Sequence, residues 1–261
     1  RIADAITPCL DNITQLIDNA VATLSHGGRV VIVGAGASGR NAVIAANEFS
    51  PDEKHPVMGL IAGGALAMLH EMSGAGQDYD RGVLDLQAIG FTQKDMLVAL
   101  TVSGKTPWLW GALRHAWSLG AMRAVITRNL HSEATDLADI VIAPQTGAEV
   151  VAGYGEPKAM AAQKMVLSML TTGLAIRSGR VYSNMRVDIR DTDTRMAERQ
   201  IAIVMEAGGC SRAEAKAALE SCNHHCKTAV LMVLTGLDAW KAHELLVQNN
   251  GFIRVALQEA P

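Results

Sequence analysis

The sequence has few cysteines, few aromatic residues and no long apolar run. Its four cysteines in 261 residues are too few and too unevenly spaced for a disulfide framework, so we expect reduced thiols at Cys9, Cys210, Cys222 and Cys226. No uninterrupted apolar stretch reaches the roughly 20 residues that span a bilayer, and the opening RIADAITPCLDN does not resemble a signal peptide. These absences predict a cytoplasmic protein without a membrane segment.

The sequence also lacks a large excess of either acidic or basic residues. The net charge is -3, and acidic and basic residues alternate without runs. No basic stripe is present for nucleic acid or for an anionic membrane surface, so neither is expected as a partner. The segment CNHHC at 222–226 suggests metal binding, with Cys222 and Cys226 on one helical face. No second ligand cluster accompanies it, and we therefore expect no metal.

Buried strands alternate with helical segments through the first part of the chain. A helical pattern over 13–24 ends at two glycines, and five β-branched or apolar runs follow, at 29–33, 57–62, 96–102, 121–127 and 139–143. This alternation predicts an α/β fold, a three-layer, doubly wound parallel sheet covered on both faces. In such sheets ligands bind at the carboxyl ends of the strands, where the glycine-rich turns fall.

The first glycine-rich turn, GAGASG at 34–39, matches the G-x-G-x-x-G dinucleotide fingerprint by its letters. A nicotinamide site also needs an acidic residue at the end of the next strand, and HPVMGLIAGG contains none. We interpret the turn as a cradle for an anion or a sugar, with the backbone at Gly36 and the hydroxyl of Ser38 as donors. The alternative is that the glycines serve only a tight turn.

The second loop, TVSGKTP at 101–107, lacks the glycine that a P-loop requires at position 99, which is Ala99. It retains hydroxyl donors interleaved with glycine at the end of a strand. We expect Ser103, Gly104 and Thr106 to bind a single phosphate monoester.

The chain changes character after about residue 180, where polar and charged residues precede amphipathic helices. We predict a domain boundary with 1–195 as the ligand-binding domain, including the N-terminal helix, and 196–261 as a small helical domain. Ser211 is expected to be the N-cap of a helix in that domain. Its core should contain Leu219, Ala229, Val230, Met232 and Val233 at helical spacing.

Several motifs together resemble one family. The S-G-x-T loop is similar to the phosphate loop of sugar isomerase (SIS) domains. Further segments together resemble the N-acetylmuramic acid 6-phosphate etherases. In order along the chain they are VGAGASGR with NE eight residues on, GLIAGG, VSGKTP, GAEVV, KAMAAQKMVLSMLTTGLAIRSGRVY, NMRVD and NNGFIRVAL. The resemblance covers nearly the whole chain, including the small helical domain, which it implies is UBA-like.

The resemblance implies a lyase that converts N-acetylmuramic acid 6-phosphate to N-acetylglucosamine 6-phosphate and D-lactate without metal or organic cofactor. A base must remove the proton at C2 of the opened sugar, and an acid must protonate the departing lactyl oxygen. Glu48 matches one of the family's two catalytic glutamates, and we assign it to the lactyl oxygen. Lys158 matches a retained position near the substrate. The resemblance also implies a homodimer with shared sites.

The sequence departs from the family at two places. The second catalytic glutamate aligns with Gly76, which cannot move a proton; Glu71 and Asp78 lie close to it in sequence. After GAEVV, the family pattern is T-G-S-x-R-M-K-A-G-T. This chain lacks two of its hydroxyl residues and its arginine, and Glu156 stands at the arginine position. A carboxylate near a phosphorylated ligand weakens its binding or indicates a different ligand.

Two other functions stay open beside the lyase. One is a non-catalytic sugar-phosphate sensor, because the family resembles the animal glucokinase regulatory protein, which keeps the fold for ligand-controlled binding. The other is an aldose-ketose isomerase, because Glu149 lies where SIS isomerases carry a catalytic glutamate; alternatively Glu149 closes a loop by accepting backbone amides. An isomerase would also need a ring-opening histidine, for which His55, His70 and His115 are candidates.

Overall fold

The computed structural model describes residues 2–49, 56–153 and 155–260. The chain forms two compact units, Arg1–Leu174 and Ala175–Pro261. The second unit therefore includes residues 175–195, which the sequence pattern groups with the ligand-binding domain.

A five-stranded parallel sheet is the centre of the first unit. Its strands run in the order β2-β1-β3-β4-β5 and comprise β1 (Val30–Gly34), β2 (Val57–Ile61), β3 (Met96–Leu100), β4 (Met122–Ile126) and β5 (Ile140–Ile142). All five predicted strands are confirmed. Every residue of β1 and β3 is buried, as expected for apolar runs in a sheet covered on both faces.

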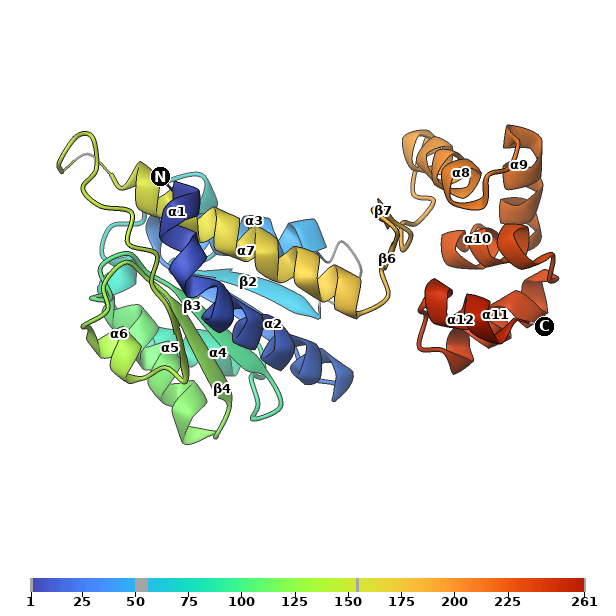
Figure 1. Ribbon diagram of the computed structural model, residues 1–261. Helices are drawn as coiled ribbons and strands as arrows, with labels where there is room; N and C mark the ends of the chain where they lie inside the picture. The colour runs from blue at the N-terminus through green and yellow to red at the C-terminus, as the bar shows by residue number, and fades with distance from the viewer. Residues whose placement is uncertain (1, 50–55, 154, 261) are drawn as a thin grey trace. The chain divides into compact units, whose positions relative to one another are not determined.

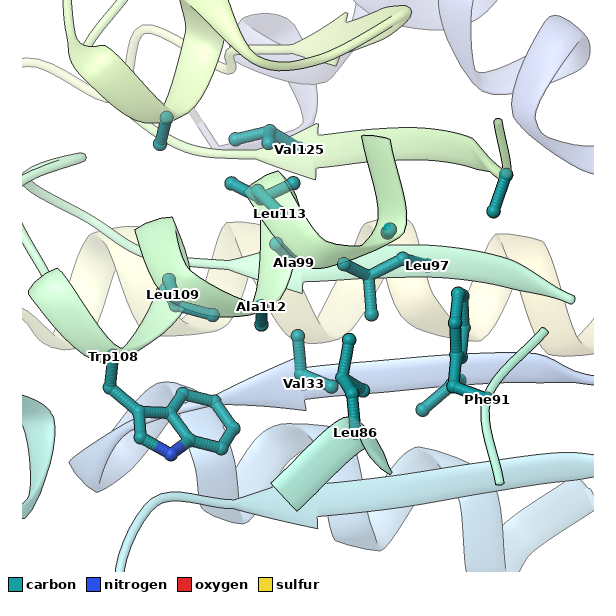
Figure 2. Packing of buried hydrophobic residues seen from close by; sticks show 14 of the residues in the cluster. Val33, Leu86, Phe91, Leu97, Ala99, Trp108, Leu109, Ala112, Leu113 and Val125 are labelled. Atoms are coloured by element: carbon teal, nitrogen blue, oxygen red, sulfur yellow. The ribbon is translucent and has the colours of Figure 1, made fainter. Parts of the chain in front are cut away.

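Helices cover both faces of this sheet (Figure 1). One layer contains α2 (Leu10–Ser25), α3 (Gly36–Phe49) and α7 (Pro157–Arg177), and the other contains α4 (Tyr79–Ala88), α5 (Pro107–Ser118) and α6 (Glu133–Asp136). Figure 2 shows the core beneath the second layer, where Trp108, Leu109 and Leu113 pack against strand residues. Shorter helices precede or interrupt these elements: α1 (Ile2–Ile6), η1 (Thr7–Cys9), η2 (Ala65–Met68) and η3 (Ala75–Gln77).

The strand order places a topological switch point between β1 and β3. The chain leaves β1 towards β2 on one side and leaves β3 towards β4 on the other. Loops that leave neighbouring strands in opposite directions open a crevice at their carboxyl ends. The glycine-rich turn after β1 and the hydroxyl-rich loop after β3 meet at this crevice.

A charged pair ties β1 to β3 at the opposite, amino-terminal edge of the sheet. The Asp95 carboxylate is 4% exposed and accepts from the Arg29 backbone N–H (2.8 Å), Arg29 Nη2 (2.9 Å) and the Thr92 N–H (2.9 Å). Burial raises the pKa of Asp95, but the hydrogen bonds from Arg29 and Thr92 outweigh it and lower that pKa below its ordinary value.

We expect Asp95→Asn to reduce the free energy of unfolding by about 1.5–3 kcal/mol at pH 7, because it weakens hydrogen bonds to a charged group. The folded-state pKa is depressed, so this contribution is present above the unfolded-state pKa of about 3.9 and is lost as pH falls through the folded value. Urea titrations followed by tryptophan fluorescence should show a smaller difference in the free energy of unfolding between parent and variant at pH 3 than at pH 7. Equal stability of parent and variant at pH 7 would contradict the prediction, and Glu133→Gln, at the exposed ion pair with Arg114, is the control.

The second unit is a helical bundle preceded by a short hairpin. The hairpin pairs β6 (Val181–Tyr182) with β7 (Met185–Arg186), and the helices are α8 (Thr194–Gly208), α9 (Arg212–Ser221), α10 (Cys226–Thr235), α11 (Ala239–Gln248) and α12 (Ile253–Glu259). Hairpin residues Tyr182 and Met185 pack against the helical core, which explains why this unit begins before residue 195. The N-cap at Ser211 is confirmed, with a reciprocal bond between Ser211 and Glu214.

Residues 222–226 differ from the helical expectation. Helix α9 ends at Ser221 and α10 begins at Cys226, because Asn223 and His224 adopt positive φ angles of 53° and 56°. Cys222 and Cys226 therefore do not share a helical face. All four cysteines are free, and within 2–49, 56–153 and 155–260 no group of three or more His, Cys, Asp or Glu residues is arranged to hold a metal.

Among the described helices, α7 alone is long and apolar enough to cross a membrane by length and composition. Two lysines interrupt it, and its buried residues include Val166, Leu167 and Leu170. The core helix of a globular unit has the same properties, so length and composition give only weak evidence of a membrane segment.

Candidate functional site

The loop after β3 is held in a fixed shape by its own hydroxyls. The Gly104 N–H donates to Oγ1 of Thr101 (3.0 Å), and the Lys105 N–H donates to Oγ of Ser103 (3.1 Å). Gly104 has a φ of +73°, and a Cβ there would lie 2.2 Å from Oγ of Ser132, so only glycine fits. Helix α5 begins immediately after Thr106, whose side chain does not cap the helix.

The turn after β1 leads directly into α3. A Cβ on Gly39 would lie 2.6 Å from the Gly34 carbonyl oxygen, so glycine is needed for the close approach of strand and helix. Gly36, at the first position of α3, has a φ of +55°. The Ser38 hydroxyl is buried and donates to Oε1 of Gln163 on α7 (3.1 Å). Its proton is therefore engaged, and the donor role predicted for Ser38 requires that this bond be exchanged.

A pocket of about 200 Å³ lies where the turn and the loop meet. It brings together three of the predicted binding residues, Ser38, Ser103 and Thr106. The pocket is lined by Ala35, Ala37, Ser38, Leu100, Thr101, Val102, Ser103, Thr106, Glu156 and Met160. Three hydroxyls from the loop and one from the turn border a space at the amino-terminal ends of α3 and α5. This arrangement suits an anionic group that accepts hydrogen bonds.

Gly76 lies against this pocket although it carries no functional group. A Cβ on Gly76 would lie 3.3 Å from Cβ of Ala35 and 3.5 Å from Cγ2 of Thr106. Its φ is not in the left-handed region, so the backbone accepts another residue. Of the two nearby carboxylates, Asp78 accepts from the Arg81 N–H as the N-cap of α4, and Glu71 is exposed. Neither of them lines the pocket.

Glu149 and Lys158 lie in the loop before α7 and at its start. The Glu149 carboxylate accepts from the backbone N–H groups of Lys158 (3.1 Å) and Ala159 (3.2 Å), and Nζ of Lys158 donates to the Ala148 carbonyl (2.7 Å). Both side chains thus close the loop and hold the start of α7. Neither is among the residues that line the pocket, and their roles in binding remain predictions.

Glu48 lies at the far end of α3. It is ten residues beyond Ser38, which at about 1.5 Å per helical residue corresponds to about 15 Å along the axis. Its carboxylate is 52% exposed and forms an ion pair with Nζ of Lys164 on α7. Within one chain, this separation exceeds the reach of a catalytic hydrogen bond to a sugar held in the pocket.

The two candidate histidines that the structure describes do not line the pocket. His70 is exposed and His115 lies in the last turn of α5, at the end opposite the pocket; His55 lies outside the described residues.

Two residues at the site were not predicted from the sequence as parts of it. Met160 lines the pocket, and Gln163 is 3% exposed and bonded to Ser38, with its Nε2 atom lacking a partner. Both residues lie in the segment KAMAAQKMVLSMLTTGLAIRSGRVY that resembles the family, but nothing in that segment marks them as parts of the site, because they reach it through the packing of α7 on α3.

Comparison with known proteins agrees with this architecture. The sequence profile of the glucokinase regulatory protein N-terminal SIS domain matches residues 12–117. A putative phosphosugar isomerase from Bacteroides fragilis superposes with a TM-score of 0.53 at 20% identity, over 70% of this chain and 89% of the isomerase. A phosphoheptose isomerase from Neisseria gonorrhoeae gives 0.52 at 15% identity, over 67% and 90%. The first unit therefore has an SIS-type fold.

Closer relatives define the family. The N-acetylmuramic acid 6-phosphate etherase of Klebsiella aerogenes is 45% identical over 260 residues, covering 98% of this chain and 87% of the relative. That of Aliivibrio fischeri (strain MJ11) is 45% identical over 262 residues, covering 99% and 87%. The chain belongs to the N-acetylmuramic acid 6-phosphate etherase family.

Proposed function

We propose that the chain binds a phosphorylated amino sugar and cleaves the lactyl ether of N-acetylmuramic acid 6-phosphate or a related sugar phosphate. The observation that carries this proposal is the convergence of Ser103 and Thr106 with the turn at Ala35–Ser38 in one pocket at the switch point. Family membership supports the same substrate class. The reaction is a carbon–oxygen elimination followed by addition of water, and it requires neither metal nor organic cofactor.

In this proposal the phosphate lies at the loop after β3. Hydroxyl donors and the start of α5 offset part of its negative charge. The turn after β1 contacts the sugar, and the side next to Gly76 faces the reacting carbons.

Glu48 is the proposed acid for the lactyl oxygen. Because it is about 15 Å from Ser38 along α3, it would have to reach the substrate from a second copy of the chain. The proposal therefore includes a homodimer with shared sites, in the cytoplasm, with no nucleic acid or membrane as partner.

Two measurements test the proposal. Isothermal titration calorimetry should show saturable binding of N-acetylglucosamine 6-phosphate and no comparable binding of unphosphorylated N-acetylglucosamine. An enzymatic lactate assay should then detect D-lactate release from N-acetylmuramic acid 6-phosphate. Failure to bind any phosphosugar would overturn the proposal as a whole.

The missing carboxylate at Gly76 favours one second candidate, a non-catalytic sugar-phosphate sensor. Binding of the phosphosugar without lactate release would support it. The isomerase alternative receives less support, because Glu149 occupies the loop-closing role by accepting two backbone amides.

We expect no saturable binding of NADH or NADPH in a fluorescence titration. The end of β2 is followed by glycines and offers no acidic residue for the ribose hydroxyls. Micromolar affinity for either nucleotide would contradict the interpretation of the turn after β1 as a sugar or anion cradle.

A further inference from the structure

Glu156 is unexpected in a pocket for a phosphate. Among the residues that line the pocket, it is the charged one, and it is acidic; the others are apolar or carry hydroxyls. A bound dianion would be repelled by this carboxylate and would meet no cation in the lining. The pocket as described is therefore incomplete for a phosphomonoester unless a cation is supplied from next to it.

Arg128 lies directly beside Glu156. Its Nη2 atom is 3.5 Å from Oε1 of Glu156, and the side chains are 35% and 40% exposed. At such exposure the ion pair is weak and is readily exchanged for another anion. A guanidinium has five N–H donors, and the bond to Glu156 uses one of them.

The backbone of Arg128 is fixed to the phosphate loop. Its N–H donates to the Val102 carbonyl (3.3 Å), and the preceding Thr127 hydroxyl donates to the same oxygen (3.2 Å). Nδ2 of the following Asn129 donates to the Ser103 carbonyl (2.8 Å). Gln145 donates to the carbonyl of Arg128 (2.9 Å). The backbone of Arg128 is thus anchored to the loop whose hydroxyls face the pocket, while its guanidinium can change position.

We propose that Arg128 is the cation that binds the phosphate of the ligand, and that Glu156 holds its guanidinium beside the pocket until the ligand replaces the carboxylate. This inference rests on the proposed function and adds the residue that determines affinity for the charged group. An arginine suits the task because its planar fork can donate two parallel hydrogen bonds to phosphate oxygens.

The test is calorimetric titration of four proteins, the parent, Glu156→Gln, Arg128→Met and the double variant, with N-acetylglucosamine 6-phosphate. Glu156→Gln should bind about 5- to 30-fold more tightly, because repulsion is removed and Arg128 is released. Adding Arg128→Met to Glu156→Gln should then weaken binding by about tenfold or more. Arg128→Lys in the same background should recover part of the loss.

The Glu156→Gln background makes the test decisive. If Arg128 only neutralised Glu156, Arg128→Met would have no effect there, and the proposal would be overturned. It would also be overturned if Glu156→Gln weakened binding, which would mean that Glu156 accepts a hydrogen bond from the sugar. A loss seen with Lys105→Met but not with Arg128→Met would identify Lys105, an exposed loop residue, as the cation instead.

A matched control and a second ligand separate this inference from the proposed function. Arg123→Met removes one positive charge from the opposite end of the neighbouring strand β4, and it should leave affinity unchanged. If neither the parent nor Glu156→Gln binds the phosphosugar in preference to N-acetylglucosamine, the proposed function fails and this inference falls with it. If both proteins bind the phosphosugar and Arg128→Met does not change affinity in the Glu156→Gln background, only the inference fails.

Discussion

Gly76→Glu is expected to raise D-lactate release from N-acetylmuramic acid 6-phosphate by about 10²- to 10⁴-fold, the usual contribution of a positioned general base. The position of Gly76 supports the expectation, since its Cβ would point at Ala35 and Thr106 beside the pocket. The 3.3 Å approach to Cβ of Ala35 requires this half-buried neighbour to move by a few tenths of an ångström. The measurement is a coupled lactate assay at saturating substrate.

Glu48→Gln added to Gly76→Glu should abolish that gain. Acid and base act on the same reaction, so their effects should be strongly non-additive. Gly76→Gln is the matched control, because it adds the same bulk without a carboxylate. If the parent already turns over at ordinary enzyme rates, another carboxylate has taken the role and the assignment of the base is wrong. If Gly76→Glu binds the phosphosugar and releases no lactate, the sensor function is the better one.

Mixed assemblies can show which chain supplies Glu48. The doubly substituted chain, Gly76→Glu with Glu48→Gln, would carry the base but no acid. Co-expressing it with the parent, which carries Glu48 but no base, should restore lactate release if Glu48 acts across a dimer. No restoration in verified mixed dimers would contradict the shared site, since the separation along α3 argues against action within one chain.

The double variant Ser103→Ala, Thr106→Val is expected to lose most affinity for phosphomonoesters. Each hydroxyl donor to a charged oxygen contributes about 1.5–3 kcal/mol, which together corresponds to about 10²- to 10⁴-fold in the dissociation constant. Both residues line the pocket. The measurement is calorimetry with N-acetylglucosamine 6-phosphate.

Ser118→Ala provides the control for that experiment. Its hydroxyl donates to the His115 carbonyl (2.7 Å) at the opposite end of α5 from Thr106, so its removal should not affect binding. Circular dichroism should confirm that the double variant stays folded, because Thr101, which holds Gly104, is left in place. Unchanged affinity in the double variant would rule out the loop after β3 as the phosphate site.

The fold could be predicted from the sequence because each strand is a short apolar run, and β1 to β4 are followed within two residues by a glycine or a hydroxyl residue. The pattern locates Val30–Gly34 and Met96–Leu100 as strands of a parallel sheet, whereas their pairing as neighbours, which brings their loops together at one edge, is known only from the structure. Local chemistry also identified Ser211 as a helix cap, since the capping box lies within four residues.

The site could be predicted only in part. Ser103 and Thr106 lie in a motif, and the structure places both at the pocket. Gln163 bonds to Ser38 only through the packing of α7 on α3, which no local spacing records. Residues 222–226 show a second limit: helical spacing was expected to place Cys222 and Cys226 on one face, but positive φ angles at Asn223 and His224 break the helix between them. Asn and His adopt left-handed backbone more often than most residues do, but the conformation is uncommon even for them, so their presence alone does not predict it.

The pair Arg29–Asp95 lies at the edge of the sheet opposite the pocket, and this separation has a consequence for how the protein can change over evolutionary time. The buried charge that joins β1 to β3 is independent of every residue in the ligand-binding loops. Substitutions at Gly76 or Glu156 therefore alter chemistry without removing an interaction that the sheet needs. One activity could therefore be replaced by another through substitutions at the carboxyl ends of the strands, while the interactions that stabilise the sheet at the amino ends stay the same.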